Sequence, residues 1–158
     1  MKTLVVYYSK TGTTKKLAER LAKELKADIE GLIDKKKRSG IMGWLIAGRD
    51  GMKRIATDIE PIKNKPANYD LVLIGGPLWG FTGVAPATRT YLLQNKDKIK
   101  KAAFFMTRGG GSPSDPALND LKNVYGKAVA GTLDIKQSKI DSPETAEQIK
   151  AFVGVLTK

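Results

Sequence analysis

The chain has 158 residues, carries a formal net charge of +12 at pH 7, and contains neither cysteine nor histidine. This length predicts a single domain that spans residues 1–158 and buries one continuous core. Without thiol or imidazole groups, the chain lacks the commonest ligands of zinc, haem and iron–sulfur clusters, and nucleophilic catalysis by Cys or by a Ser–His pair is excluded. Any redox chemistry must therefore come from a bound organic cofactor.

The location of the protein follows from what its sequence lacks. No apolar run is long enough to cross a bilayer, and the amino terminus starts with a strand-like segment instead of a signal sequence. The absence of disulfides also suits a reducing compartment. We therefore expect a cytoplasmic protein.

The strong positive charge predicts an anionic partner, which could be a phosphate, a nucleic acid, an acidic protein or a membrane surface. Basic residues are spread along most of the chain, with one denser run at residues 35–38. A solvated surface that aids solubility is favoured over a dedicated nucleic-acid-binding face.

The first predicted elements are a strand, a helix and a second strand. Residues 3–8 form a short apolar run rich in β-branched and aromatic types, which is typical of a strand buried on both faces of a parallel sheet. After Gly12, apolar residues recur at helical spacing and form one stripe. The members of this stripe are Leu17, Ala18, Leu21, Ala22 and Leu25. Residues 27–33 alternate between apolar and polar types, as in an edge strand.

Residues 41–55 combine large apolar side chains with several glycines. Gly43, Gly48 and Gly51 interrupt the apolar pattern, and each glycine costs about 1 kcal/mol relative to alanine inside a helix. We expect a broken helix whose apolar residues pack on the core.

The second half of the chain continues the alternation of strands and helices. A buried strand is predicted at 69–74 and ends where Gly75, Gly76 and Pro77 form a loop. The remaining predicted elements are a helix at 85–95, a strand at 101–106, a helix at 115–125, a strand at 127–133, and a last helix opened by Ser142, Pro143 and Glu144. This order predicts an α/β fold with five parallel strands and helices on both faces of the sheet.

The clearest functional motif lies between the first strand and the first helix. Its residues are Ser9, Lys10, Thr11, Gly12, Thr13 and Thr14. Hydroxyl groups and backbone N–H groups at a helix N-terminus can bind one phosphate, which also lies at the positive end of the helix dipole. A helix cap is the alternative, but a cap needs one hydroxyl and this loop has four. The glycine patterns of dinucleotide and nucleoside-triphosphate loops are absent, which favours a monophosphate.

This Ser-x-Thr-Gly-x-Thr pattern resembles the FMN-phosphate loop of flavodoxins, and the resemblance extends over nearly the whole chain. It implies a doubly wound sheet with strand order 2-1-3-4-5, FMN as the cofactor, and flavin contacts from two further loops. The second loop contains Pro77, Leu78, Trp79 and Gly80. The third loop contains Thr107, Arg108, Gly109, Gly110 and Gly111.

The second and third loops also suggest roles from their residue types. Trp79 is expected to stack on the flavin, because it lies past the predicted strand; a tryptophan in the core is the alternative. The glycines of the third loop could donate backbone N–H groups to the flavin or could form an ordinary flexible turn.

Two features differ from many flavodoxins. Residues 107–115 contain no aromatic side chain that could cover the second face of the flavin, and the chain is strongly basic where many flavodoxins are acidic. We therefore expect one open flavin face and acidic redox partner proteins.

Two functions remain open from the sequence. The first is an electron carrier that passes electrons between partner proteins, with chemistry supplied by FMN. The alternative is an NAD(P)H-dependent FMN quinone or flavin reductase, which the missing aromatic residue favours and the short chain disfavours. A nucleic-acid-binding role rests on charge alone, and no recognition motif supports it.

Overall fold

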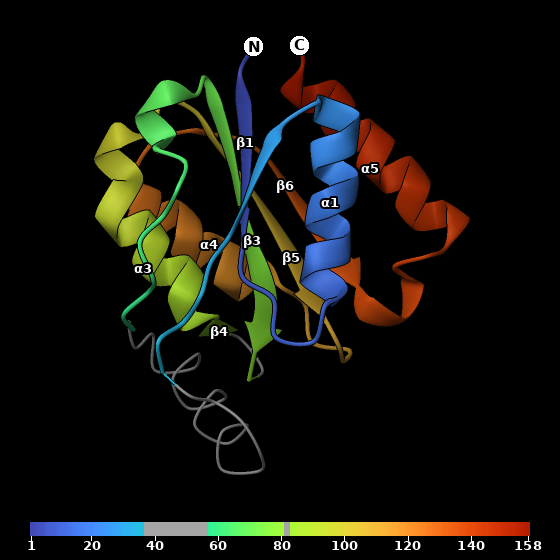
Figure 1. Ribbon diagram of the computed structural model, residues 1–158. Coiled ribbons are helices and arrows are strands. Elements are labelled where there is room, and N and C mark those ends of the chain that lie inside the picture. The colour runs from blue at the N-terminus through green and yellow to red at the C-terminus, as the bar shows by residue number, and fades with distance from the viewer. Residues whose placement is uncertain (37–56, 81–82) are drawn as a thin grey trace.

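A parallel β-sheet lies between two pairs of helices, as the computed structural model shows for residues 1–36, 57–80 and 83–158 (Figure 1). One face of the sheet is covered by α1 (Thr13–Leu25) and α5 (Pro143–Leu156). The other face is covered by α3 (Pro86–Asn95) and α4 (Asp115–Tyr125). The helix expected at residues 41–55 lies outside the described residues.

The sheet has the strand order β2-β1-β3-β5-β6, and these five strands are parallel. They are β1 (Thr3–Tyr7), β2 (Asp28–Gly31), β3 (Leu71–Trp79), β5 (Ala102–Arg108) and β6 (Val129–Lys136). The predicted doubly wound, flavodoxin-like order is confirmed. The sequence did not predict β4 (Gly83–Val84), a short strand that pairs antiparallel with the end of β3.

The helices begin where the sequence signals indicated. Ser142 caps α5, because its Oγ accepts a hydrogen bond from the N–H of Thr145 at 3.2 Å. The predicted helix at 115–125 matches α4 at both ends. Short 3₁₀ turns complete the connections as η1 (Pro66–Asn68), η2 (Lys96–Lys98) and η3 (Gln137–Lys139).

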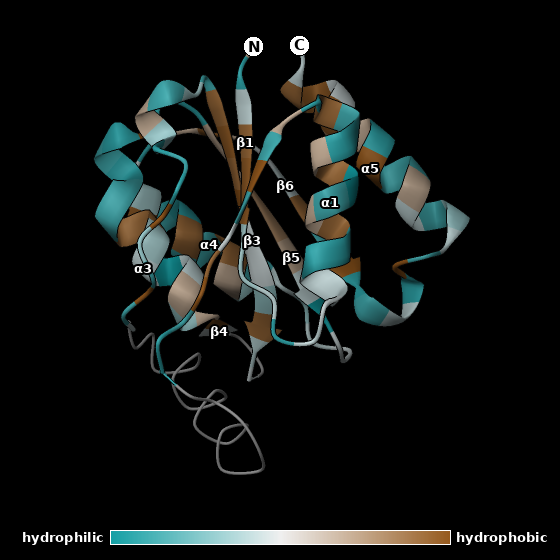
Figure 2. Cartoon of the chain, in the orientation of Figure 1, coloured by the Kyte–Doolittle hydropathy of each residue, from teal (hydrophilic) through white to brown (hydrophobic). Residues whose placement is uncertain are grey.

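Alternate residues of the central strands supply two apolar layers. Along β1, Leu4 and Val6 join the layer under α3 and α4, whereas Val5 joins the layer under α1 and α5. Figure 2 shows apolar residues along the strands and polar residues on the outer helix faces. Each fully buried aliphatic or phenylalanine side chain contributes about 1.5–3 kcal/mol to stability. The two layers therefore hold the strands, and the loops that follow them, in fixed positions.

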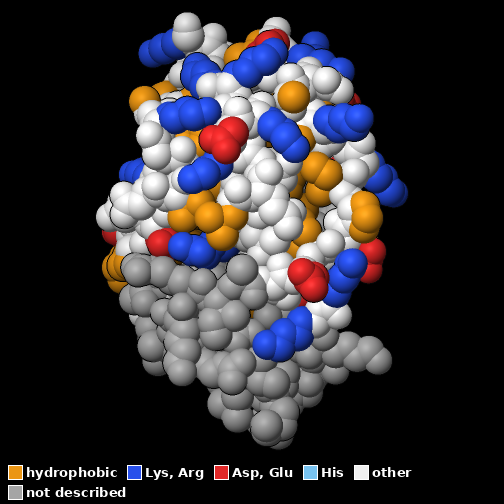
Figure 3. Space-filling model, turned by 90° about the vertical axis from the view of Figure 1, so that its left-hand side faces the viewer, with side chains coloured by type: hydrophobic (Ala, Val, Ile, Leu, Met, Phe, Trp, Pro, Cys, Tyr) orange, Lys and Arg blue, Asp and Glu red, His pale blue; other side chains and the backbone are white. Residues whose placement is uncertain are grey.

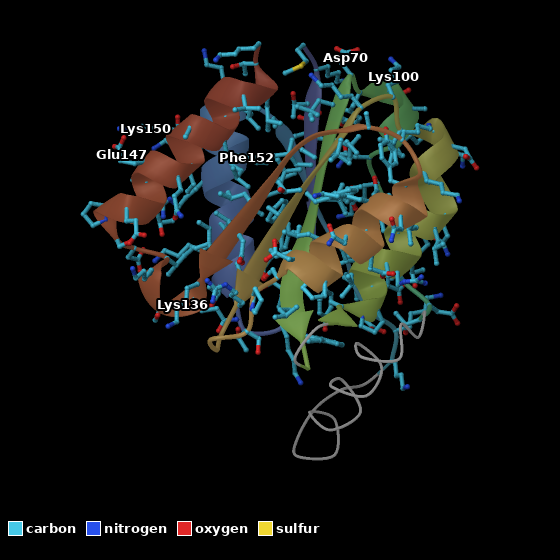
Figure 4. The ribbon with its side chains drawn as sticks, turned by 180° about the vertical axis from the view of Figure 1, so that it is seen from behind. Asp70, Lys100, Lys136, Glu147, Lys150 and Phe152 are labelled. Carbon is cyan, nitrogen blue, oxygen red and sulfur yellow. The ribbon has the colours of Figure 1, made fainter. Side chains whose placement is uncertain are left out.

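Helix α5 shows the same division between buried apolar and exposed polar side chains. Figure 4 labels Lys150 and Glu147, which form an exposed ion pair at 3.0 Å, and Phe152, which is 6% exposed. The ring of Phe152 lies against Gly131 of β6, because a Cβ atom there would meet the ring at 3.1 Å. One side of the helix therefore packs on the sheet and the other contacts solvent.

The prediction of a strand at 69–74 that breaks at Gly75 is wrong, because β3 starts at Leu71 and continues to Trp79. A Cβ atom on Gly75 would lie 2.3 Å from the ring of Phe105, and one on Gly76 would lie 2.4 Å from Oγ1 of Thr88. These glycines therefore permit close packing and do not break the strand. Pro77 has no N–H group to donate to a neighbouring strand. It is tolerated because the pairing of β3 with β1 ends at Gly75, so no β1 partner lies beside Pro77.

The ends of the other predicted strands also differ, and the strand expected at 3–8 ends one residue earlier, at Tyr7. The strand expected at 101–106 continues to Arg108, so Thr107 and Arg108 belong to β5 and not to a loop. The strand expected at 127–133 is shifted toward the carboxyl terminus and ends at Lys136. The edge strand expected at 27–33 is shorter, at Asp28–Gly31.

Candidate cofactor site

Three loops meet at the carboxyl end of the parallel strands, opposite the two chain termini (Figure 1). They follow β1, β3 and β5, and the three groups of residues predicted from the sequence lie in these loops, at the ends of β3 and β5, and in the first turn of α1. Two contacts join them. The Oγ1 atoms of Thr14 and Thr107 lie 2.7 Å apart and share a hydrogen bond. The rings of Tyr8 and Trp79 meet edge to face at 5.4 Å between centroids.

The first loop leaves the N-terminus of α1 open. Gly12 is the N-cap residue, with φ of +101°, and no side chain caps the helix. A Cβ atom on Gly12 would meet nothing within 4 Å, so the positive φ, and not a lack of space, favours glycine. Ser9 stabilises the turn, because its Oγ accepts a hydrogen bond from the N–H of Gly12 at 3.0 Å.

The charges around this helix end favour an anion. The first intrahelical bond runs from the N–H of Lys16 to the carbonyl of Gly12, so the N–H groups of residues 13–15 precede the helix ladder. The first turn contains no acidic residue and includes Lys15. The positive charge of Lys15 is unfavourable at the positive end of the helix dipole. An anion bound there is instead attracted both by the dipole and by Lys15. The loop therefore fits a phosphate group.

The four hydroxyl residues of this loop occupy different environments. Thr11 is exposed, and Ser9 and Thr13 are half-buried. Thr14 is 1% exposed and its hydroxyl already bonds to Thr107, so it joins the first loop to β5. Lys10 is exposed at the tip of the loop.

The second predicted group lies at the end of β3. Trp79 is the last residue of the strand and is 7% exposed, so the premise that it lies beyond the strand is wrong. Pro77 is buried, Leu78 is half-buried, and Gly80 is exposed with φ of +63°. The packing of Trp79 against Tyr8 supports the core alternative, and flavin stacking stays a prediction. No pattern in the sequence indicates a site role for Tyr8, which lies at the end of an apolar run.

The third group is held by an ion pair that the sequence analysis missed. Nε of Arg108 donates to Oδ2 of Asp134 at 2.8 Å, and Oγ of Ser114 donates to Oδ1 of the same carboxylate at 2.8 Å. Nη1 of Arg108 also donates to the carbonyl of Gly110 at 3.1 Å. Asp134, from β6, therefore ties both ends of loop 109–114 to the sheet. The only indication of this role in the sequence is that an acidic residue directly follows the strand predicted at 127–133.

The glycines of the third loop leave its surface accessible. Gly109, Gly110 and Gly111 are exposed, and a Cβ atom on Gly110 or Gly111 would meet nothing within 4 Å. Backbone N–H groups here can approach a planar ligand without a side chain between them.

The residues whose pKa values are shifted lie away from these loops. Burial, together with a hydrogen bond to Asp28, raises the pKa of Tyr69 to about 12. Burial also raises the pKa of Tyr91 and of Tyr125 above the usual range. A hydrogen bond from the backbone N–H of Lys2 lowers the pKa of Asp70, which lies with Lys100 at the end of the sheet opposite the loops (Figure 4).

The described part of the chain offers neither a metal site nor a membrane-spanning helix. Residues 1–36, 57–80 and 83–158 contain no group of three or more acidic, cysteine or histidine side chains placed to hold a metal ion. Within the same ranges, no helix combines the length and apolar character needed to span a bilayer.

The sequence profile of the family described as Flavodoxin matches residues 2–154. The chain belongs to the flavodoxin family. A comparison with curated proteins gives no match. The fold is similar to that of several solved structures.

The first is a flavoprotein in complex with FMN from Lactobacillus acidophilus NCFM, at 29% identity and a TM-score of 0.69, with 89% of this chain and 96% of that chain covered. A candidate flavoprotein from Bacteroides eggerthii DSM 20697 has 24% identity and a TM-score of 0.76, with 99% and 98% covered. Oxidised flavodoxin 2 from Bacillus cereus has 17% identity and a TM-score of 0.62, with 99% and 98% covered. The last two support the fold alone.

Proposed function

We propose that this flavodoxin-family chain is an electron carrier that binds FMN at the carboxyl end of its sheet and transfers electrons between partner proteins. The uncapped N-terminus of α1 at Gly12, with no acidic residue in its first turn, carries the proposal, because it suits the phosphate of FMN. FMN is the cofactor that family membership indicates, and the Lactobacillus acidophilus relative was solved with FMN.

Bound FMN would supply the electron-transfer chemistry, and the protein would supply binding and orientation. The N–H groups of residues 13–15 and the hydroxyls of Ser9, Thr11 and Thr13 would hold the phosphate. Trp79 would flank the ring system from the end of β3. The backbone of Gly109–Gly111, fixed through Arg108 and Asp134, would contact the polar edge of the ring.

The partners are proposed to be acidic proteins, because the net charge is +12. Opposite charges accelerate association, and salt screens them over a Debye length of about 8 Å at physiological ionic strength. Electron transfer to a physiological partner should therefore slow as salt increases. Rates that do not change with salt would contradict a steering role for these charges. The cytoplasmic location stays a prediction.

A reductase is the second candidate, because residues 107–115 contain no aromatic side chain that could cover the second face of the flavin. An open face would allow a nicotinamide to approach the ring. This candidate differs from the carrier in its electron donor, which is NAD(P)H instead of a protein.

The two candidates are separated by reductive titration of the FMN-loaded protein without oxygen. Dithionite should reduce the carrier, whereas NADH and NADPH should leave it oxidised and should support no turnover on a quinone. Rapid reduction by NADPH with catalytic quinone turnover would favour the reductase. A purified protein that retains no FMN would contradict both candidates.

A further inference from the structure

A pocket lies on the flank of the molecule, between residues 59–67 and the C-terminal end of α3. Its volume is about 690 Å³, which falls within the range of about 300–1,000 Å³ typical of small-molecule sites. None of its lining residues belongs to the three loops at the carboxyl end of the sheet. The pocket is therefore separate from the proposed cofactor site and does not depend on it.

The walls of this pocket are largely apolar. Five apolar residues from the chain before β3 line it, namely Ile59, Pro61, Ile62, Pro66 and Ala67. Ile59 and Ile62 pack against the core under α3, and Pro66 is buried in η1, so this wall is anchored to the sheet. The C-terminal end of α3 forms the opposite wall through Gln94 and Asn95.

The charged lining residues carry mostly positive charge. Lys35, Lys65 and Lys98 line the pocket together with one acidic residue, Glu60. Within residues 1–36, 57–80 and 83–158, none of the three lysine side chains has an ion-pair partner. Figure 3 faces this flank and shows hydrophobic side chains exposed among Lys and Arg side chains.

Apolar walls, together with three lysines that form no ion pair with another described residue, indicate the chemical class of the ligand. An apolar molecule without charge would leave the lysines unused, and a cation would be repelled by a net positive lining. An inorganic anion would leave the apolar walls in contact with water. We propose that this pocket binds a small organic anion, such as a medium-chain carboxylate, with its apolar body against the isoleucines and prolines and its carboxylate at the lysines.

Titration of the FMN-loaded protein with decanoate tests this site, and binding is measured by calorimetry and by amide NMR shifts. Decanoate should bind with a dissociation constant below about 1 mM and should bind about tenfold or more tightly than hexanoate, because each buried CH₂ strengthens binding. Decyltrimethylammonium, which has the same apolar chain and the opposite charge, should bind at least tenfold more weakly than decanoate. The largest NMR shifts should occur at the pocket residues, including Ile62 and Asn95.

Charge reversal supplies the matched comparison. The double variant Lys65→Glu, Lys98→Glu should weaken decanoate binding at least tenfold and leave FMN bound. The control Lys23→Glu, Lys158→Glu changes the net charge equally at two exposed positions outside the pocket and should bind decanoate like the parent. The proposal is overturned if decanoate does not bind, if its shifts fall elsewhere, if the ammonium probe binds equally well, or if both double variants lose affinity equally.

Discussion

The contacts of Asp134 predict that this residue controls FMN affinity without touching the cofactor. Its carboxylate accepts hydrogen bonds from Arg108 and Ser114, both at 2.8 Å, and Arg108 in turn holds the carbonyl of Gly110. Asp134→Asn keeps the shape of the side chain but removes its charge and one of the two acceptor oxygens. Loop 109–114 should then become less well ordered before FMN binds.

The size of the effect follows from the bonds that are lost. A hydrogen bond to a charged group contributes about 1.5–3 kcal/mol, and about 1.4 kcal/mol corresponds to a tenfold change in affinity. The side chains of Arg108 and Asp134 are 24% and 28% exposed, so the lower end of that range applies. We expect the FMN dissociation constant to rise about tenfold in Asp134→Asn, measured by the quenching of flavin fluorescence.

The ion pair between Arg89 and Asp120 provides the control, since its N–O distance is 3.0 Å and it joins α3 to α4. Asp120→Asn should lower the free energy of unfolding at least as much as Asp134→Asn does, because its ion pair is more buried, while FMN affinity stays near that of the parent. Equal losses of FMN affinity in the two variants would refute a specific role for Asp134 and would indicate a general effect of stability.

Three further changes have defined outcomes. Trp79→Ala should lower the free energy of unfolding by about 3–5 kcal/mol in urea denaturation, because the side chain is 7% exposed; a change below about 1 kcal/mol would contradict its packing role. Gly12→Ala should destabilise the FMN-free protein by about 1–2 kcal/mol, because Gly12 has a φ of +101°. The control Gly154→Ala in α5 should not destabilise it. Equal effects would refute the argument that the positive φ of Gly12 requires glycine. The pKa of Tyr69 is raised from 10.0 to about 12, so its protonated form is favoured by folding; this stabilisation is complete below pH 10 and is lost as pH rises to about 12. Tyr69→Phe should show a smaller loss of stability than the parent between pH 9 and pH 11, and identical pH profiles would contradict this.

The order of the elements could be predicted from the sequence because each one carries a strong local signal. Buried strands appear as short apolar runs, and α4 begins at Asp115 with a proline in its first turn. Parallel strands joined by helices then leave few possible topologies. The first loop could also be located, since a glycine among hydroxyl residues directly precedes a helix.

The errors arose where a residue's role depends on neighbours distant in sequence. Gly75 and Gly76 resembled strand breakers, but the ring of Phe105 and the hydroxyl of Thr88 require glycine at these positions. The pairing of Arg108 with Asp134 joins residues 26 positions apart, and no local pattern indicates it. Trp79 was expected beyond the strand for the same reason, because the end of β3 was placed too early.

The central claim is that the open end of α1 holds the phosphate of FMN, and paired titrations with FMN and riboflavin test it most directly. Riboflavin has the same ring system and no phosphate, so only FMN should depend on this loop. If the hydroxyls of Thr11 and Thr13 bind the phosphate as proposed, the double variant Thr11→Ala, Thr13→Ala removes two hydrogen bonds to a charged group, each worth about 1.5–3 kcal/mol. We expect FMN affinity to fall at least about tenfold and riboflavin affinity to stay unchanged. FMN affinity equal to that of the parent, or an equal fall for both ligands, would contradict the phosphate site.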